Sequence, residues 1–82
     1  MKKSVRVSMQ TDLEARPIAN LVQLANKYSS SIYLEKDSSR VNAKSIMGMM
    51  SLALLNGEDV VLDVEGADEA EALAAMEKFL ME

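Results

Sequence analysis

Three stretches of the chain alternate apolar and polar residues, the two-residue period of a strand that buries one face. In the first, Val5, Val7 and Met9 alternate with Arg6 and Ser8. The other two lie at residues 31–35 and 60–64. A short fourth strand at residues 40–42 is expected to return after the polar turn at 37–39, because a turn of this composition closes a hairpin.

Apolar residues that recur every three or four positions predict two amphipathic helices. The apolar stripe of the first contains Ile18, Leu21, Val22 and Ala25. Because Pro17 fits a first helical turn and not a helix interior, this helix begins near Ala15. The last helix opens at Asp68, with Glu71 three residues on as a capping box. Its apolar stripe contains Leu73, Met76 and Leu80.

A short helix is expected at residues 45–52, which are poor in β-branched residues, and it ends before Gly57. The predicted order is therefore βαββαβα. Each strand has one apolar face, which favours a single four-stranded antiparallel sheet with all three helices on that face. This α/β (α+β) arrangement is an open-faced sandwich. With 82 residues, the chain has room for one core, so residues 1–82 are predicted to form a single domain.

The composition narrows the classes of function. The chain has no cysteine and no histidine, and it lacks a glycine-rich phosphate loop, so we expect neither an enzyme nor a cofactor or metal site. A net charge of -4 argues against direct binding to nucleic acid, which requires clustered Lys and Arg. No apolar stretch behind the N-terminus has the length of a signal peptide or membrane span. A cytoplasmic protein that binds other proteins is therefore expected.

Two predicted helix starts carry polar residues that suit a functional site. At the first helix, Glu14 and Arg16 place a carboxylate and a guanidinium beside unpaired backbone N–H groups. Glu14 also has a plainer interpretation, because an acid there stabilises a helix by about 0.3–1 kcal/mol through its dipole. At the short helix, Lys44 precedes Ser45, whose plainer interpretation is a helix cap. The residue types alone leave both interpretations open.

The short helix has more apolar side chains than it can bury. Ile46, Met47, Met49 and Met50 cannot all face inward on a helix of this length. Two of the four are expected in the core. The others are expected on the surface, where methionine suits adaptable contacts with proteins.

Two separated segments resemble the HPr family, the histidine phosphocarriers of the bacterial sugar phosphotransferase system. Asp12-Leu13-Glu14-Ala15-Arg16-Pro17 is similar to that family's Gly-Leu-His-Ala-Arg-Pro motif, and residues 34–37 and 41–48 are similar to its regulatory serine region. The resemblance spans essentially the whole chain and implies the family's βαββαβα fold. Within the family, the chain most resembles the catabolite-repression HPr-like proteins (Crh), which also lack the active histidine.

The resemblance implies a regulatory role without phosphate transfer. Glu14 stands where the family has its phosphorylated histidine, and a carboxylate would have to form an acyl phosphate instead. Ser45 matches the serine that HPr kinase/phosphorylase modifies. The phosphorylated form would then bind a LacI-type catabolite control regulator as a corepressor. The residues implied in partner binding are Arg16, Ala19, Lys44, Ser45, Ile46, Met47 and Met50.

Two other functions remain as alternatives. In one, the protein is a phosphotransferase-system component in which Glu14 accepts phosphate or mimics phosphohistidine. In the other, it is a small-molecule-binding regulatory domain, which is weaker because no convergent polar pocket can be identified from the sequence. The protein is expected to be a monomer or a dimer that exchanges its first strand.

Overall fold

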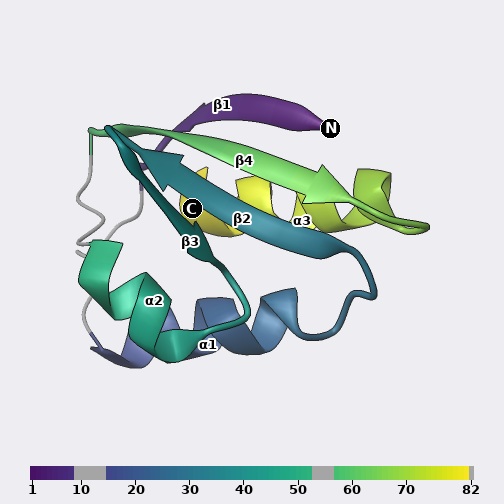
Figure 1. Cartoon of the computed structure of the whole chain (residues 1–82), viewed down its shortest axis with the longest axis horizontal. Helices are drawn as coiled ribbons and strands as arrows, with labels where there is room; N and C mark the ends of the chain where they lie inside the picture. The colour runs from purple at the N-terminus through teal and green to yellow at the C-terminus, as the bar shows by residue number, and fades with distance from the viewer. Residues whose placement is uncertain (9–14, 53–56, 82) are drawn as a thin grey trace.

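The computed structural model describes residues 1–8, 15–52 and 57–81, with the backbone alone for residues 15–17. Its elements follow the predicted order βαββαβα (Figure 1). The strands are β1 (Lys2–Arg6), β2 (Ser31–Lys36), β3 (Ser39–Asn42) and β4 (Asp59–Glu65). The helices are α1 (Ala15–Ala25), α2 (Ile46–Leu52) and α3 (Glu69–Met81). The start of α1 at Ala15 agrees with the position expected from Pro17.

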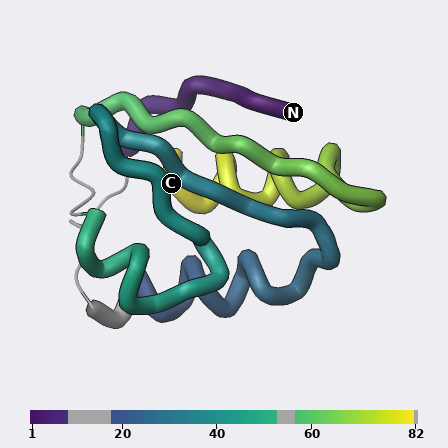
Figure 2. Tube along the Cα trace, viewed as in Figure 1, coloured from purple at the N-terminus to yellow at the C-terminus, as the bar shows by residue number. Residues whose placement is uncertain are grey.

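The strands form one antiparallel sheet in the order β1-β4-β2-β3. The central strand β4 pairs with β1 from Lys2↔Asp63 to Arg6↔Asp59, and with β2 on its other side. All three helices lie on one face of this sheet, and the opposite face is open (Figures 1 and 2). The predicted sheet and its one-sided helical layer are therefore confirmed. Among the helices that the structure describes, none has the length and apolar character needed to cross a membrane.

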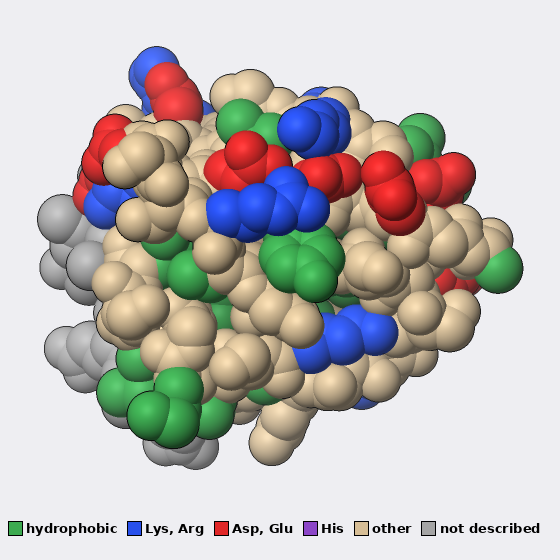
Figure 3. Space-filling model, viewed as in Figure 1, with side chains coloured by type: hydrophobic (Ala, Val, Ile, Leu, Met, Phe, Trp, Pro, Cys, Tyr) green, Lys and Arg blue, Asp and Glu red, His purple; other side chains and the backbone are tan. Residues whose placement is uncertain are grey.

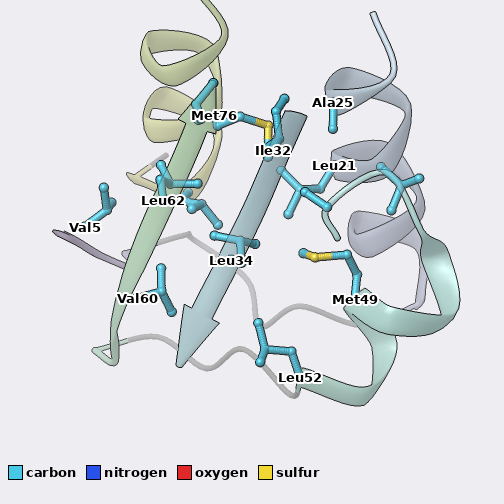
Figure 4. Close-up of a cluster of buried hydrophobic side chains, with 14 of the residues drawn as sticks. Val5, Leu21, Ala25, Ile32, Leu34, Met49, Leu52, Val60, Leu62 and Met76 are labelled. Atoms are coloured by element: carbon cyan, nitrogen blue, oxygen red, sulfur yellow. The ribbon is translucent and has the colours of Figure 1, made fainter. Parts of the chain in front are cut away.

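The hydrophobic core lies between the sheet and the helices (Figure 4). Its buried side chains come from β1, β2 and β4 (Val5, Ile32, Leu34, Val60, Leu62 and Val64) and from the helices (Ile18, Leu21, Val22, Ala25, Met49, Leu52, Ala72, Met76 and Leu80). The predicted stripe of α1 is thus entirely buried. In α3, the predicted Leu73 is only half-buried, and its neighbour Ala72 is fully buried instead.

The first strand begins and ends earlier than the alternation at residues 5–9 predicts. β1 begins at Lys2, because Lys2 to Arg6 pair with β4 although their side chains are mostly polar. It ends at Arg6, which pairs with Asp59, the first residue of β4. Val7 nevertheless stays in the core, and its N–H donates to the carbonyl of Glu58 at 2.9 Å. Met9, the last residue of the predicted strand, lies outside the described residues.

The hairpin between β2 and β3 is tighter than expected. Lys36 pairs directly with Ser39, so the turn contains only Asp37 and Ser38 and the third predicted turn residue belongs to β3. Asp37 has a φ of 55°, a left-handed conformation that aspartate adopts more readily than most residues.

The Asp68 carboxylate connects two loops, a role that the capping-box prediction missed. One oxygen accepts hydrogen bonds from the hydroxyl and the N–H of Ser30, and the other accepts from the N–H of Ser29 at 2.9 Å. Ser30 is buried, because the chain at Gly66 passes directly over it. A β-carbon at Gly66 would lie 2.6 Å from the Ser30 α-carbon, so this position requires glycine.

This arrangement predicts a pH-dependent contribution of Asp68 to stability. Its hydrogen bonds, first of all that from the Ser30 hydroxyl, lower the pKa of Asp68 from 3.8 to about 2. Because the pKa is lower in the folded protein than in the unfolded chain, the contribution is complete above about pH 4 and is lost as the pH falls towards 2. Asp68→Asn is expected to flatten the dependence of the melting temperature on pH in this window.

The matched control is Glu71→Gln, which removes an exposed carboxylate from the same helix. Thermal unfolding followed by circular dichroism between pH 2 and 6 measures both variants. An equal flattening by Glu71→Gln would show that the net charge of the helix start, and not the bonds to Ser29 and Ser30, sets the dependence.

Candidate functional site

Ser45 is an exposed residue immediately before α2. Its carbonyl accepts the N–H of Met49 at 3.0 Å, and its side-chain oxygen accepts the N–H of Gly48 at 3.4 Å. These are the bonds of a helix N-cap. The cap interpretation of Ser45 is therefore confirmed. It does not exclude modification, because the cap bond is long and the hydroxyl faces solvent.

The neighbouring Lys44 is oriented by a different set of bonds. Its ammonium donates to the carbonyl of Tyr28 at 2.7 Å, and its backbone N–H donates to the Asn42 side chain at 2.8 Å. The Asn26 side-chain amide donates to the Lys44 carbonyl at 3.3 Å. Lys44 thus holds the start of α2 against the segment that follows α1. To contact a phosphate at Ser45, its ammonium would have to leave Tyr28.

The exposed side chains of Ile46, Met47 and Met50 form what we call the α2 apolar patch. They are 42%, 81% and 52% exposed, whereas Met49 is fully buried. The expectation that two of these four side chains belong to the core is therefore wrong. Of the four, only Met49 points from α2 into the core. Figure 3 shows hydrophobic side chains gathered at the lower left, where Figure 1 draws α2.

The other predicted site residues lie on α1 or before it. Glu14 and Asp12 lie outside the described residues, and Arg16 belongs to the first turn of α1, where only the backbone is described. Ala19 is half-buried on the same helix. Because Lys44 contacts Asn26 beyond the end of α1, Ser45 lies at the opposite end of this helix from Arg16. A helix of 11 residues is about 16 Å long, and a partner that contacted both positions would span most of α1.

The serines that compete with Ser45 are not equally accessible. Ser29, Ser31 and Ser38 are exposed, as expected for polar connections. Ser30 lies in the same polar stretch as Ser29 and Ser31, but it is only 1% exposed and its hydroxyl donates to Asp68, so it is inaccessible. The close approach of the Gly66 backbone, distant in sequence, causes this burial.

A charged cluster on the open face of the sheet escaped the sequence analysis. The Arg40 guanidinium donates to Glu35 at 2.5 Å and to Asp63 at 2.9 Å, and it lies 4.3 Å above the centre of the Tyr33 ring. Asp63 is 93% buried beneath it, with a relative exposure of 7%. In Figure 3, basic and acidic side chains alternate across this region. The sequence gives no signal for the cluster, because it depends on which residues of β2, β3 and β4 are paired. No group of carboxylates in the described part of the chain is arranged to hold a metal ion.

Comparisons with known proteins agree on one family. All 82 residues match the family model described as "PTS HPr component phosphorylation site". The HPr-like protein Crh of Halalkalibacterium halodurans is 50% identical over 80 residues, which cover 98% of this chain and 95% of that protein.

Solved structures agree with this match. The phosphocarrier protein HPr of Bacillus anthracis superimposes with a TM-score of 0.92 at 46% identity, covering 98% of this chain and 95% of the other. The crystal structure of Crh from Bacillus subtilis, a domain-swapped, intertwined dimer, gives a TM-score of 0.79 at 50% identity, covering 93% and 87%.

Proposed function

Because the chain belongs to the HPr family, we propose that it is a regulatory protein of carbon catabolite control and not an enzyme. HPr kinase/phosphorylase phosphorylates Ser45, and the product binds a LacI-type catabolite control regulator as a corepressor. One observation carries this proposal. An exposed Ser45 is directly followed by the exposed Ile46 and Met47, in a chain that has no histidine to carry phosphate. These partners act in the cytoplasm, which is therefore the proposed location.

The position of Ser45 supports its use as a switch. Phosphorylation adds about -1.5 to -2 charges, which the free N–H groups of a helix start stabilise. The negative charge then lies beside the α2 apolar patch. A partner with a basic group next to an apolar pocket would contact both features at once. The net charge of -4 adds repulsion, so the basic group of the partner supplies the compensating charge.

Two parallel incubations test the proposed function. In one, the protein receives ATP and HPr kinase/phosphorylase; in the other, it receives phosphoenolpyruvate and the first enzyme of the phosphotransferase system. We expect phosphate only in the ATP incubation. Phosphate from phosphoenolpyruvate at a rate like that of HPr would favour the alternative, in which Glu14 accepts phosphate. The close structural match to the phosphocarrier protein HPr of Bacillus anthracis supports this alternative.

Met47→Asp is expected to weaken docking to both the kinase and the regulator by about 2 to 4 kcal/mol, because it places a charge in a desolvated contact. Since Met47 is 81% exposed, the free energy of unfolding should change by only about 0.5 kcal/mol. Met81→Asp, at a methionine outside the α2 apolar patch that is 51% exposed, is the matched control. Calorimetry and thermal unfolding measure the two quantities. A collapse of the melting temperature would place Met47 in the core.

We further propose that the protein exchanges β1 between two copies, as the Crh dimer of Bacillus subtilis exchanges a domain. β1 lies at the edge of the sheet, and its contacts with β4 can be remade by the β1 of a second copy. Ser4 and Val61 are paired across β1 and β4, so a disulfide between Ser4→Cys and Val61→Cys reports the exchange. It should link two chains in the dimer fraction and close within one chain in the monomer fraction. A dimer fraction without interchain links would contradict exchange.

A further inference from the structure

Every sulfur atom of the chain belongs to a methionine. Seven methionines are present and there is no cysteine, so no thiol competes for an oxidant. Among the described residues, Met49 and Met76 are fully buried, whereas Met47 is 81% exposed and Met50 is 52% exposed. Met1 and Met81 are each 51% exposed, but neither lies on α2. The α2 apolar patch therefore contains two accessible thioethers, three residues apart and on the same side of one helix.

We propose that Met47 and Met50 are reversible oxidation sites, and that their sulfoxides switch off docking through the α2 apolar patch. This regulation rests on the proposed function, because it acts on the same docking surface. The oxidant is a peroxide, with hydrogen peroxide as the simplest member of the class. The reductant is a thiol-dependent methionine sulfoxide reductase.

The methionine thioether is the only group of the protein that takes part in the reaction. The sulfur attacks one peroxide oxygen, the O–O bond breaks, an S–O bond forms, and water leaves. Sulfur loses two electrons and the peroxide gains them. In the reverse step, two thiols supply two electrons, the sulfoxide oxygen leaves as water, and a disulfide forms on the reductant.

Because the accessible methionines lie on the surface, their oxidation should change docking and leave folding unchanged. A sulfoxide is a strong hydrogen-bond acceptor and polar, so burying it without a donor in a partner's apolar pocket is unfavourable. On the free protein, the same oxygen at Met47 or Met50 points into water. Met49 and Met76, whose oxidation would disrupt the core, are inaccessible while the protein is folded.

Peptide mapping by mass spectrometry during a hydrogen peroxide time course tests the site. We expect Met47 to gain its oxygen first, Met50 and Met81 at similar later rates, and Met49 and Met76 only after unfolding. Circular dichroism should be unchanged at the stage where Met47 and Met50 are oxidised. Early oxidation of Met49, or loss of folded structure at this stage, would overturn the proposal.

The initial rate of Ser45 phosphorylation by HPr kinase/phosphorylase, at limiting substrate, tests the consequence. We expect oxidation to lower this rate at least about tenfold, the size of effect when an interface loses an anchor. Methionine sulfoxide reductase should restore it. The double variant Met47→Leu, Met50→Leu should have the same rate before and after peroxide treatment, whatever that rate is, whereas Met81→Leu should remain sensitive.

Three results have distinct meanings. An oxidised wild-type protein that is phosphorylated as fast as the reduced one overturns the proposed switch. Equal sensitivity of the Met47→Leu, Met50→Leu variant also overturns it, because the effect then arises elsewhere. If the reduced protein is not phosphorylated at all, the proposed function fails and the switch fails with it. Oxidation of Met47 before the other described methionines in the peptide map would still support the α2 apolar patch as a modification site.

Discussion

Ser45→Ala is expected to abolish both the phosphate label introduced by HPr kinase/phosphorylase and the binding of the regulator. The alanine lacks the hydroxyl that receives phosphate. Ser51 is also exposed on α2, but it lies in the last turn, where its hydroxyl donates to the carbonyl of Gly48 at 2.7 Å. Ser29 and Ser31 lie at the other end of β2 from Ser38, and all three are away from α2. Mass spectrometry should place a single phosphate on the Ser45 peptide of the wild-type protein.

A control must show that Ser45→Ala loses the label because it lacks the hydroxyl, and not because α2 has lost its N-cap. Loss of a cap costs about 1 kcal/mol, which is tolerable for a folded domain. Ser45→Asn is the matched control, since asparagine caps a helix as well as serine does but has no hydroxyl. It should keep the melting temperature of the wild type and remain unlabelled. A Ser38→Ala variant should be labelled normally. Regulator binding that is unchanged by Ser45→Asn would contradict the corepressor proposal.

Glu14→His is expected to convert a protein that takes no phosphate from phosphoenolpyruvate into one that does, at least in part. Imidazole is a good nucleophile near neutral pH and a good leaving group once phosphorylated, whereas a carboxylate forms a high-energy acyl phosphate. Asp12→Gly in the same chain should increase acceptance, because it removes a negative charge next to the incoming phosphate and restores the residue of the family motif.

The label on Glu14→His should be acid-labile and should require the first enzyme of the phosphotransferase system. Glu14→Gln is the control, because it removes the carboxylate without supplying an imidazole, and it should stay unlabelled. Phosphorylation of Ser45 should be the same in all of these variants, because none of them changes α2 or the residues that hold its start, Asn26 and Tyr28. Efficient labelling of the unmodified protein from phosphoenolpyruvate would contradict the prediction and would assign a transfer role to Glu14.

The fold could be predicted from the sequence because its signals are local. Alternation around Val5, Ile32 and Leu62, the position of Pro17, and the apolar stripe of α1 each depend on neighbours within one element. Because each strand has one apolar face, the helices must cover that face of the sheet, which predicts a one-sided sandwich. The element boundaries were less predictable, because strand ends depend on the length of the partner. β1 stops at Arg6 where its partner β4 begins.

For the candidate site, the sequence by itself determined the chemistry, because chemistry depends on residue type. The absence of histidine and cysteine, Glu14 in the family's histidine position, and Ser45 before an apolar pair are all properties of the chain as written. Residue type and spacing left both the cap and the switch open as interpretations of Ser45. The resemblance to the HPr family then indicated a regulatory protein with its proposed switch before the short helix.

Only the tertiary structure decided which side chains are available for that chemistry. It buries Ser30 beneath Gly66, leaves three of the five large apolar side chains of α2 exposed, and directs the Lys44 ammonium to Tyr28. It also assembles the cluster around Arg40 on the open face. Each of these outcomes requires contacts between segments that are distant in sequence. Local periodicity carries no information about them, because exposure and pairing are set by what the rest of the chain packs against each element.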